Sequence, residues 1–593
     1  MSKVPSPLVW AFWAHEPIQF YQRRHADLNS PLGTGRWTPL WYDRIHTREA
    51  IARMADAGVN LFYSHFYKGF GLEFEHDQMM RTAEIVKYAH EFGIRVCGYC
   101  TIGTVYHETL IDEFPEVLDC VAKREDGLPY HPGFEGGFNS RCFTCYSDTP
   151  YWRDYYPKLL RFGLETVGLD GFHFDNATER PCHCQRCTSE FRAWLAEHAG
   201  DPHDYALASW RHVCIPSDEG ALEPIYIQWR NFRRDRCCKR HATTFRLVKS
   251  IDPEAIVLYN PGLGRFSETG YEPVDTPPEA DLSFIEATNA IRITPEGGHM
   301  TTVAGFNIAR LAGIQTLNAS WYHNEHSLRI PENPEEIALY EAEHIVYGGA
   351  AGTHWLGRPT KHGAGMVLDD PMQYELQKKI FHYFKEHADL YAKSKHEAHV
   401  HVLYSPDSMR FYPDRIRKAV MELSEKLRAA GVPWDFVTAD GQEPPAGELV
   451  LLPDVMVLSD ADAERLQAWH CHIHAYGDAG RLDNHGVERE APVFADAGEP
   501  VLASPFGLDF PDGLLETSVA PDGDKLIHLI NMRNMEPIDK LSLTLPFDAD
   551  DVELYSFESG VTAELVGRTV TVHNLKTLAT LKLKGTLFKN VTP

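Results

Sequence analysis

Long apolar runs are missing from this chain of 593 residues. No window holds the roughly 18 apolar residues that a helix needs to cross a bilayer. The first residues, MSKVPSPLVWAFWAH, also lack the basic start and the apolar, helix-length segment of a secretion signal. We therefore expect a soluble, cytoplasmic protein without a membrane partner.

Positive charge is scarce as well. Lysine and arginine total 57 against 84 aspartate and glutamate residues, so the formal net charge is −27. Such a chain repels polyanions, and no Lys/Arg-rich run offers a track for phosphates. Nucleic acid and anionic membranes are therefore not expected as partners.

Cysteine is too sparse for a disulfide scaffold, with 12 residues in the whole chain. Cys182, Cys184 and Cys187 nevertheless lie close enough in sequence to bind one ion, and tetrahedral zinc would take its fourth ligand from Cys145 or Cys142. A closed site of four thiolates leaves no position for water, so this zinc would be structural and would join two long loops. The alternative is a chance cluster of reduced cysteines. No organic cofactor is expected.

Short apolar runs alternate with longer helical patterns over the first 355 residues, as is typical of repeated βα units. Eight such units within about 395 residues fit a (β/α)8 TIM barrel, whereas a doubly wound open sheet seldom reaches eight. The predicted strands are residues 8–14, 59–66, 95–101, 171–174, 255–260, 281–286, 314–320 and 350–355.

Two smaller units follow the predicted barrel. An apolar run, a helix and two further apolar runs indicate a small α/β domain with a parallel sheet, and short period-2 segments near the end indicate an antiparallel β-sandwich. We therefore predict domains at residues 1–395, 396–497 and 498–593. The abbreviated second domain leaves both a dimer and a trimer open for the expected homo-oligomer.

Carboxylates end only a few of the predicted strands. The C-terminal ends of parallel barrel strands converge on one mouth, where reacting residues lie. Asp175 follows the fourth strand and Glu286 ends the sixth, with Glu16 after the first as a third candidate. A glycosidase needs two carboxyl groups facing one pocket, so we predict Asp175 and Glu286 as the catalytic pair. The alternative is that both are turn or cap residues.

The remaining strand ends are rich in aromatic, histidine and asparagine side chains. Aromatic faces stack on sugar rings, and His and Asn bond hydroxyl groups, so their joint occurrence predicts a carbohydrate pocket. Taken one at a time, these residues could equally belong to the core. The predicted substrate-binding residues are His15, Glu16, Tyr63, His65, Tyr99, His173, Asn176, Asn260, Trp321, His354 and Trp355.

A strand ending in Asp175-Asn176, followed by C-x-C-x2-C and an F-R-x-W-L helix, resembles the barrel of the family 42 β-galactosidases. Arg141 and Cys145 ahead of a Ser-Asp-Thr-Pro turn continue the likeness. The small α/β domain, similar to the trimerisation domain of that family, and the terminal β domain extend it over nearly the whole chain. The resemblance implies substrate binding by Arg141 and zinc binding by four cysteines, which are Cys145, Cys182, Cys184 and Cys187.

The catalytic pattern departs from that family. Its acid/base Glu directly follows the Asn of the fourth strand, where this chain has Ala177, and its nucleophile Glu lies on the seventh strand, which here reads Asn318-Ala319-Ser320. An Asp at the end of strand four is instead similar to the α-L-fucosidase-like proteins of family 151 and to α-galactosidase-type barrels. This second resemblance implies that Asp175 is the nucleophile and Glu286 the acid/base.

We therefore expect a retaining exo-glycoside hydrolase that removes a terminal sugar from an oligosaccharide or glycoside, similar to an α-L-fucosidase or α-galactosidase. One alternative is a β-galactosidase that uses Glu179 and another loop carboxylate. Another is a barrel that binds carbohydrate without cleaving it. A metal-dependent amidohydrolase would need a His-x-His pair on the first strand, and WAFWAHEP has none.

Overall fold

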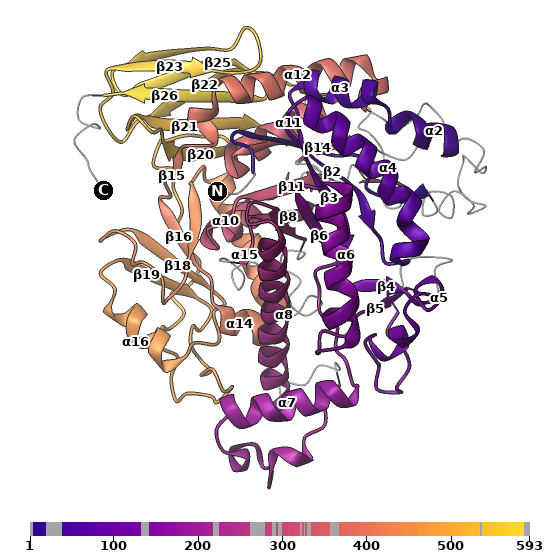
Figure 1. Ribbon diagram of the computed structural model, residues 1–593. Coiled ribbons are helices and arrows are strands. Elements are labelled where there is room, and N and C mark those ends of the chain that lie inside the picture. Colours follow the sequence, from indigo (N-terminus) through magenta and orange to yellow (C-terminus); the bar gives the residue numbers. More distant parts are fainter. Residues whose placement is uncertain are drawn as a thin grey trace.

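The computed structural model describes residues 4–18, 38–131, 141–217, 224–260, 279–287, 292–293, 299–320, 323–324, 327–328, 334–355, 367–533 and 536–585. Its largest sheet has eight parallel strands in the order β11-β8-β7-β6-β3-β2-β1-β14. Each strand lies on one of the predicted apolar runs, and together they form the nearly closed barrel of the TIM type that the sequence predicts (Figure 1). Their bounds are β1 (Leu8–Phe12), β2 (Leu61–Tyr67), β3 (Arg95–Thr101), β6 (Gly171–Asp175), β7 (Ile256–Tyr259), β8 (Leu282–Ala287), β11 (Thr316–Ser320) and β14 (Ala350–His354).

Alternate residues of these strands face opposite sides of the sheet. Trp10, Phe12 and Phe284 belong to one buried cluster inside the barrel, whereas the intervening Val9 and Ala11 belong to the larger cluster beneath the helices. Both faces are apolar because the parallel sheet is covered on both sides, which explains the continuous apolar runs in the sequence.

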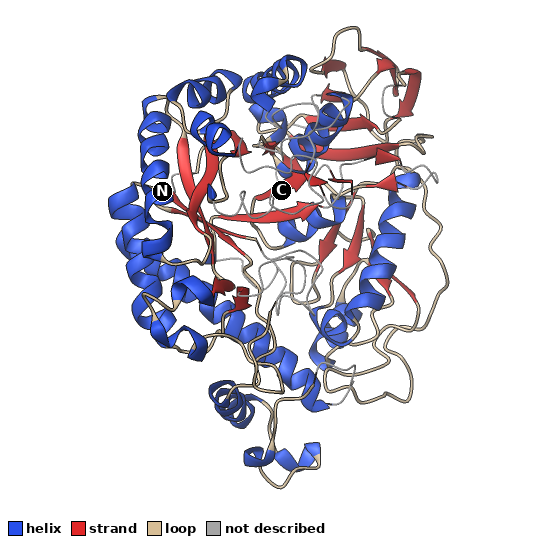
Figure 2. Cartoon of the chain, turned by 90° about the vertical axis from the view of Figure 1, so that its right-hand side faces the viewer, coloured by secondary structure: helices blue, strands red, loops and turns tan. Residues whose placement is uncertain are grey.

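Helices surround the strands, and they line the outer side of the strands near the N-terminus (Figure 2). Thr47 caps the first barrel helix by accepting a hydrogen bond from the Ala50 amide, and Gly58, with a φ of 100°, ends it. The principal helices are α3 (Arg48–Ala57), α4 (Leu72–Glu91), α6 (Tyr156–Phe162), α8 (Pro224–Ile251), α10 (Val303–Leu311), α11 (Pro334–Glu343) and α12 (Pro371–Glu386).

Side chains that follow β11 join the first and last strands of the sheet order. The Tyr340 hydroxyl donates to the Asn318 carbonyl of β11 and lies 3.3 Å from the Gly352 carbonyl of β14. His344 lies 3.4 Å from the Asn318 amide through Nε2 and 3.2 Å from the Gly352 carbonyl through Nδ1. Glu341 accepts the Gly352 amide at 2.9 Å. Helix α11 and the residue directly after it therefore support the seam between these two strands.

A long excursion follows β3. It contains the antiparallel pair β4 (Thr104–Tyr106) and β5 (Arg141–Phe143). After β6 the chain enters α7 (Gln185–His198), whose N-cap residue Cys184 accepts the Cys187 amide through its sulfur. Figure 1 shows α8 running beside the barrel strands with α7 at its lower end, and the two helices contact each other.

Two further β-sheet units follow the barrel. The first is a parallel sheet in the order β17-β16-β18-β19, as predicted for a small α/β unit. The second is a pair of antiparallel sheets that share one apolar core, β15-β20-β21-β26-β23 and β22-β25-β24. The predicted domain limits at residues 395 and 497 remain predictions. Among the described helices, none combines the length and apolar character needed to cross a bilayer.

The strands of these two units have the bounds β15 (Lys395–His396), β16 (Val400–Leu403), β17 (Trp434–Val437), β18 (Leu449–Pro453), β19 (His472–Tyr476), β20 (Gly513–Val519), β21 (Lys525–Asn531), β22 (Ile538–Thr544), β23 (Asp551–Tyr555), β24 (Thr562–Val566), β25 (Thr569–Leu575) and β26 (Leu578–Lys584).

Candidate active site and metal centre

Asp175 is the last residue of β6, and both of its carboxylate oxygens accept hydrogen bonds. Oδ2 accepts from the Tyr99 hydroxyl and from the Asn176 side-chain amide. Oδ1 accepts from Asn260 Nδ2 at 3.0 Å. Asn176 has a φ of 52°, in the left-handed region that asparagine tolerates better than most residues, so the chain turns away from the strand directly after Asp175.

Lys68 is a buried cation that the sequence analysis did not single out. Its Nζ atom donates to Tyr99 Oη at 2.9 Å and to Glu16 Oε1 at 3.0 Å. Nζ also lies 4.6 Å from the centre of the Tyr99 ring. The side chain follows β2 directly, so its position just beyond a barrel strand was the available signal. His15 Nε2 lies 3.9 Å from Glu16 Oε1. One connected group therefore joins the ends of β1, β2, β3 and β6.

Charge in this group keeps Asp175 ionised. Burial alone would raise the pKa of Asp175, but the charge of Lys68, followed by that of His173 in the acidic range where it is protonated, the Tyr99 hydrogen bond and Arg141, outweighs burial and lowers that pKa below its usual range. Burial also lowers the pKa of His173 to about 4, so this imidazole is neutral at pH 7. Burial, followed by the charge of Asp175, raises the pKa of Tyr99 well above its ordinary value. Tyr99 therefore stays a neutral donor to an anionic Asp175.

An aromatic layer underlies the carboxylate inside the barrel. The His173 ring lies 5.5 Å from Tyr99 in a stacked arrangement and 5.0 Å from Tyr63. His354 stacks on Phe12 at 4.6 Å. Among the described residues, the two ring nitrogens of His173 and the Tyr63 hydroxyl have no hydrogen-bond partner. Buried polar atoms of this kind ordinarily bind water or a ligand group.

Other predicted substrate-binding residues occupy different places. His65 Nε2 lies 3.1 Å from Glu75 of α4, and both side chains are fully buried. Trp355 packs in the outer core, with its ring stacked on Phe381 at 6.1 Å. The structure therefore does not bring Trp355 to the Asp175 group. Trp321 lies outside the described residues.

Arg141 lies near Asp175, and only the backbone of Glu286 is described. Arg141 is buried and donates to Thr104 Oγ1 at 3.1 Å, from where it still lowers the pKa of Asp175. Glu286 lies in β8, where its backbone pairs in register with Ala319 of β11. Its side chain lies outside the described part of the structure.

Glu179, the carboxylate of the alternative β-galactosidase hypothesis, is fully buried against α8. It accepts a hydrogen bond from Arg236, and its Oε2 lies 3.6 Å from Arg233 Nε. The carbonyl of Glu179 also accepts from Arg233 at 2.9 Å. Two arginines thus lie beside this carboxylate, and its role in the alternative hypothesis stays a prediction.

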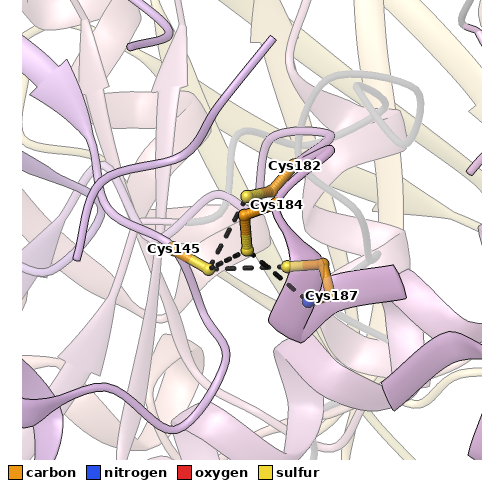
Figure 3. Close-up of side chains that lie close together, drawn as sticks. All are labelled: Cys145, Cys182, Cys184 and Cys187. Carbon is orange, nitrogen blue, oxygen red and sulfur yellow. Dashed lines mark hydrogen bonds between the residues drawn. The ribbon is translucent and has the colours of Figure 1, made fainter. Parts of the chain in front are cut away.

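The sulfur atoms of Cys145, Cys182, Cys184 and Cys187 all lie within 4.8 Å of one another (Figure 3). Cys145 Sγ is 3.7 Å from Cys182, 3.9 Å from Cys184 and 3.5 Å from Cys187. Tetrahedral zinc with bonds of about 2.3 Å spaces its sulfurs by about 3.8 Å, so these residues fit such an ion. Cys142 lies outside the group, with its sulfur 3.4 Å from His107 Nδ1. The geometry thus favours Cys145 as the fourth ligand.

Hydrogen-bond donors surround the sulfurs as they do around metal thiolates. The Lys123 amide donates to Cys182 at 3.3 Å, and Arg236 Nη1 donates to Cys187 at 2.9 Å. Hydrogen bonds within the cluster, first with Cys145 and then with Cys182, lower the pKa of Cys184 to about 7, while those from Cys145 and the other cysteines raise the pKa of Cys182, so the thiols share protons in the absence of an ion. Thiols that ionise near neutral pH are ready metal ligands.

The comparisons with known proteins agree with the fold. No family model matches the chain. The β-galactosidase GalA of Bacillus licheniformis is 26% identical over 171 residues, which cover 26% of this chain and 24% of GalA. The matched stretch thus spans about a quarter of that relative.

Two solved structures share nearly the whole architecture. A catalytic mutant of a GH42 β-galactosidase from G. stearothermophilus has a TM-score of 0.72 at 13% identity, covering 99% of both chains. The α-L-fucosidase isoenzyme 2 of Paenibacillus thiaminolyticus has a TM-score of 0.64 at 13% identity, covering 97% of this chain and 99% of its own. The fold of this chain is therefore that of GH42 β-galactosidases and of an α-L-fucosidase, as the resemblance in the sequence implied.

Proposed function

We propose that this chain is a retaining exo-glycoside hydrolase with Asp175 as the nucleophile and Glu286 as the acid/base. The observation that carries this proposal is the anionic Asp175, held by Tyr99 and Asn260 at the C-terminal end of a barrel strand. That end of a TIM barrel is where catalytic residues lie. A carboxylate that is already ionised and oriented is prepared for attack on an anomeric carbon.

The reaction has two displacement steps. In the first, Asp175 bonds to the anomeric carbon while the bond to the leaving oxygen breaks and Glu286 gives its proton to that oxygen. In the second, Glu286 takes a proton from water, which displaces Asp175 and releases the sugar. The retaining geometry requires a carboxyl separation of about 5–5.5 Å.

The proposed role of Glu286 is supported by strand periodicity. Leu282 and Phe284, four and two positions earlier in β8, belong to the cluster inside the barrel. Side chains alternate with a period of two along a strand, so the position of Glu286 belongs to the same series. This series leads to the mouth where β6 presents Asp175.

We propose that the rest of the connected group binds hydroxyl groups of a terminal sugar. Oε2 of Glu16 is buried and has no hydrogen-bond partner within the described part of the chain, which suits it to accept from a sugar hydroxyl. Lys68 supplies a donor beside Glu16, and Asn260 supplies one beside Asp175. The fucosidase structure of similar fold supports an α-L-fucoside as substrate, and an α-galactoside is the second sugar of this proposal.

The metal in this proposal is zinc, bound by Cys145, Cys182, Cys184 and Cys187. Four thiolates fill a tetrahedral shell, so the ion would join the segment after β5 to the start of α7 and take no part in the reaction. Assembly as a dimer or trimer, a cytoplasmic location and independence of organic cofactors remain predictions.

A panel of nitrophenyl glycosides tests the proposed activity. Release of nitrophenol from an α-L-fucoside or an α-galactoside, with retention of configuration in the NMR spectrum of the first product, is the expected result. Asp175→Asn should lower kcat by at least about 1,000-fold while leaving folding and metal content unchanged. Full activity of that variant would remove Asp175 from the mechanism, and binding of glycosides without any release would identify a non-catalytic barrel.

Glu286→Gln tests the second role independently. A dinitrophenyl leaving group needs no protonation, so this variant should still form the glycosyl-enzyme rapidly with such a substrate and then stall. Added azide, which needs no general base, should restore turnover and give a glycosyl azide. A variant that hydrolyses poor leaving groups at the wild-type rate would remove Glu286 from the acid/base role.

A further inference from the structure

Arg236 of α8 contacts two residues of the segment that follows β6, a proposed metal ligand and a buried carboxylate. Its Nη1 atom donates to the Cys187 sulfur at 2.9 Å, and its Nη2 atom donates to Glu179 Oε1. We propose that Arg236 is a positioning residue that couples the metal centre to the segment between Asp175 and Cys182. This inference rests on the proposed metal site and is independent of the proposed hydrolysis.

Charge balance supports this role. Four thiolates and one divalent ion leave two negative charges, and Glu179 adds a third in the same buried region. Arg233 and Arg236 are also buried and bring two positive charges to this place. A buried charge is stable only when it is paired, so the anionic centre and Glu179 both depend on these arginines.

Neutralising Glu179 does not by itself explain why Arg236 also contacts Cys187. Arg233 already contacts the carboxylate and the carbonyl of Glu179, so Glu179 would keep a counter-ion without Arg236. Only Arg236 also reaches a thiolate among the contacts described for α8. Its planar guanidinium can bind two acceptors in fixed directions, which a lysine cannot do.

The same helix also holds the other half of the metal site. Arg240, one turn beyond Arg236, donates to the carbonyls of Tyr146 and Ser147 at 2.8 Å and 3.3 Å, directly after Cys145. Ser147 Oγ in turn lies 3.1 Å from the Cys187 sulfur. One face of α8 therefore organises both cysteine segments and the residues that follow Asp175.

Metal release from the full-length holoprotein tests the coupling. Arg236→Met should release zinc to a coloured chelator at least about 10-fold faster than wild type, because loss of an outer partner commonly weakens metal binding by 10- to 100-fold. Arg246→Met is the matched control: it removes the same charge from the same helix at an exposed pair with Glu279. The control should release zinc at the wild-type rate.

Two further variants separate charge from bridging. Arg236→Lys keeps the positive charge but loses the planar group that binds two acceptors at once. Its rate of zinc release should stay within about threefold of wild type. Glu179→Gln should also retain zinc. In both variants, amide hydrogen exchange of residues 176–181 should become faster than in wild type while peptides elsewhere are unchanged. If the glycosidase activity is present, kcat should fall in these two variants with their zinc still bound.

The outcomes decide the proposal without reference to activity. Wild-type zinc release by Arg236→Met, or unchanged exchange of residues 176–181 in Glu179→Gln, would overturn it. Equal acceleration of release by Arg236→Met and Arg246→Met would reduce the effect to net charge and would also overturn it. If Arg236→Met does not fold, the exchange of residues 176–181 in Arg236→Lys and Glu179→Gln decides the proposal, and unchanged exchange in both variants would overturn it.

Discussion

The ammonium nitrogen of Lys68 lies 2.9 Å from the hydroxyl oxygen of Tyr99, and that hydroxyl donates to Asp175. Lys68 thus acts on Asp175 in two ways, as a charge and as a partner of the residue that binds it. Among the influences that lower the pKa of Asp175, the charge of Lys68 is the largest. Replacing Lys68 with an uncharged side chain of similar size removes both influences together, and a variant that keeps the charge separates them.

Lys68→Met should raise the pKa of Asp175, because the carboxylate loses its principal cation while remaining buried. The proposed mechanism needs ionised Asp175, so the acidic limb of the kcat/KM profile should move to higher pH by about one unit or more. For a shift of one unit, the loss in kcat/KM relative to wild type should approach about 10-fold at a pH below both pKa values and should be small at pH 6. The measurement is a pH profile of kcat/KM on a nitrophenyl glycoside, which reports the free enzyme.

Lys68→Arg is the control for this prediction, because it retains a positive charge at the same place. Its acidic limb should stay close to that of wild type even if its rate falls through altered geometry. A Lys68→Met profile with the wild-type limb would separate Lys68 from the ionisation of Asp175.

Sequence periodicity was sufficient to identify the strands and many of the side chains at the barrel mouth. Periodicity was insufficient where a shift of one residue decides which side chain faces the inside of the barrel. His354 stacks on Phe12 inside the barrel, whereas its neighbour Trp355 packs outside on Phe381. Both residues follow the same apolar run, and the sequence contains no marker for which of them faces inwards.

Lys68 was missed for a related reason. The pairing of β2 with β3 shifts between His65 and Tyr67, so counting by two no longer holds beyond that irregularity. The ion pair of Glu179 with Arg236 joins residues 57 positions apart and depends on how α8 lies against the cysteine segments. Contacts of this kind follow from tertiary packing, which local patterns do not encode.

The four-cysteine group allows a direct test of ligand identity. Cys145→Ser should reduce bound zinc from about one ion per chain to a small fraction, because it removes one of four thiolates. Cys142→Ser should keep the ion, since the Cys142 sulfur faces His107 instead of the cluster. Metal content by atomic emission after gel filtration gives the answer. Loss of zinc from Cys142→Ser together with its retention in Cys145→Ser would reverse the assignment.

The buried Glu341 predicts how stability depends on pH. Burial raises the pKa of Glu341 from 4.5 to about 8 in the folded protein, although its carboxylate accepts the Gly352 amide. Folding therefore takes up a proton between pH 4.5 and about 8, and the contribution of Glu341 to the free energy of unfolding should decrease as pH rises through that range.

Glu341→Gln mimics the protonated form, so the fall in stability between pH 5.5 and pH 8.5 should shrink by on the order of 2–4 kcal/mol. Urea unfolding at the two pH values measures this difference, with the exposed Glu386→Gln as the charge-matched control. The same fall in stability in Glu341→Gln as in wild type would show that Glu341 is already ionised at neutral pH, with its charge accommodated beside β14.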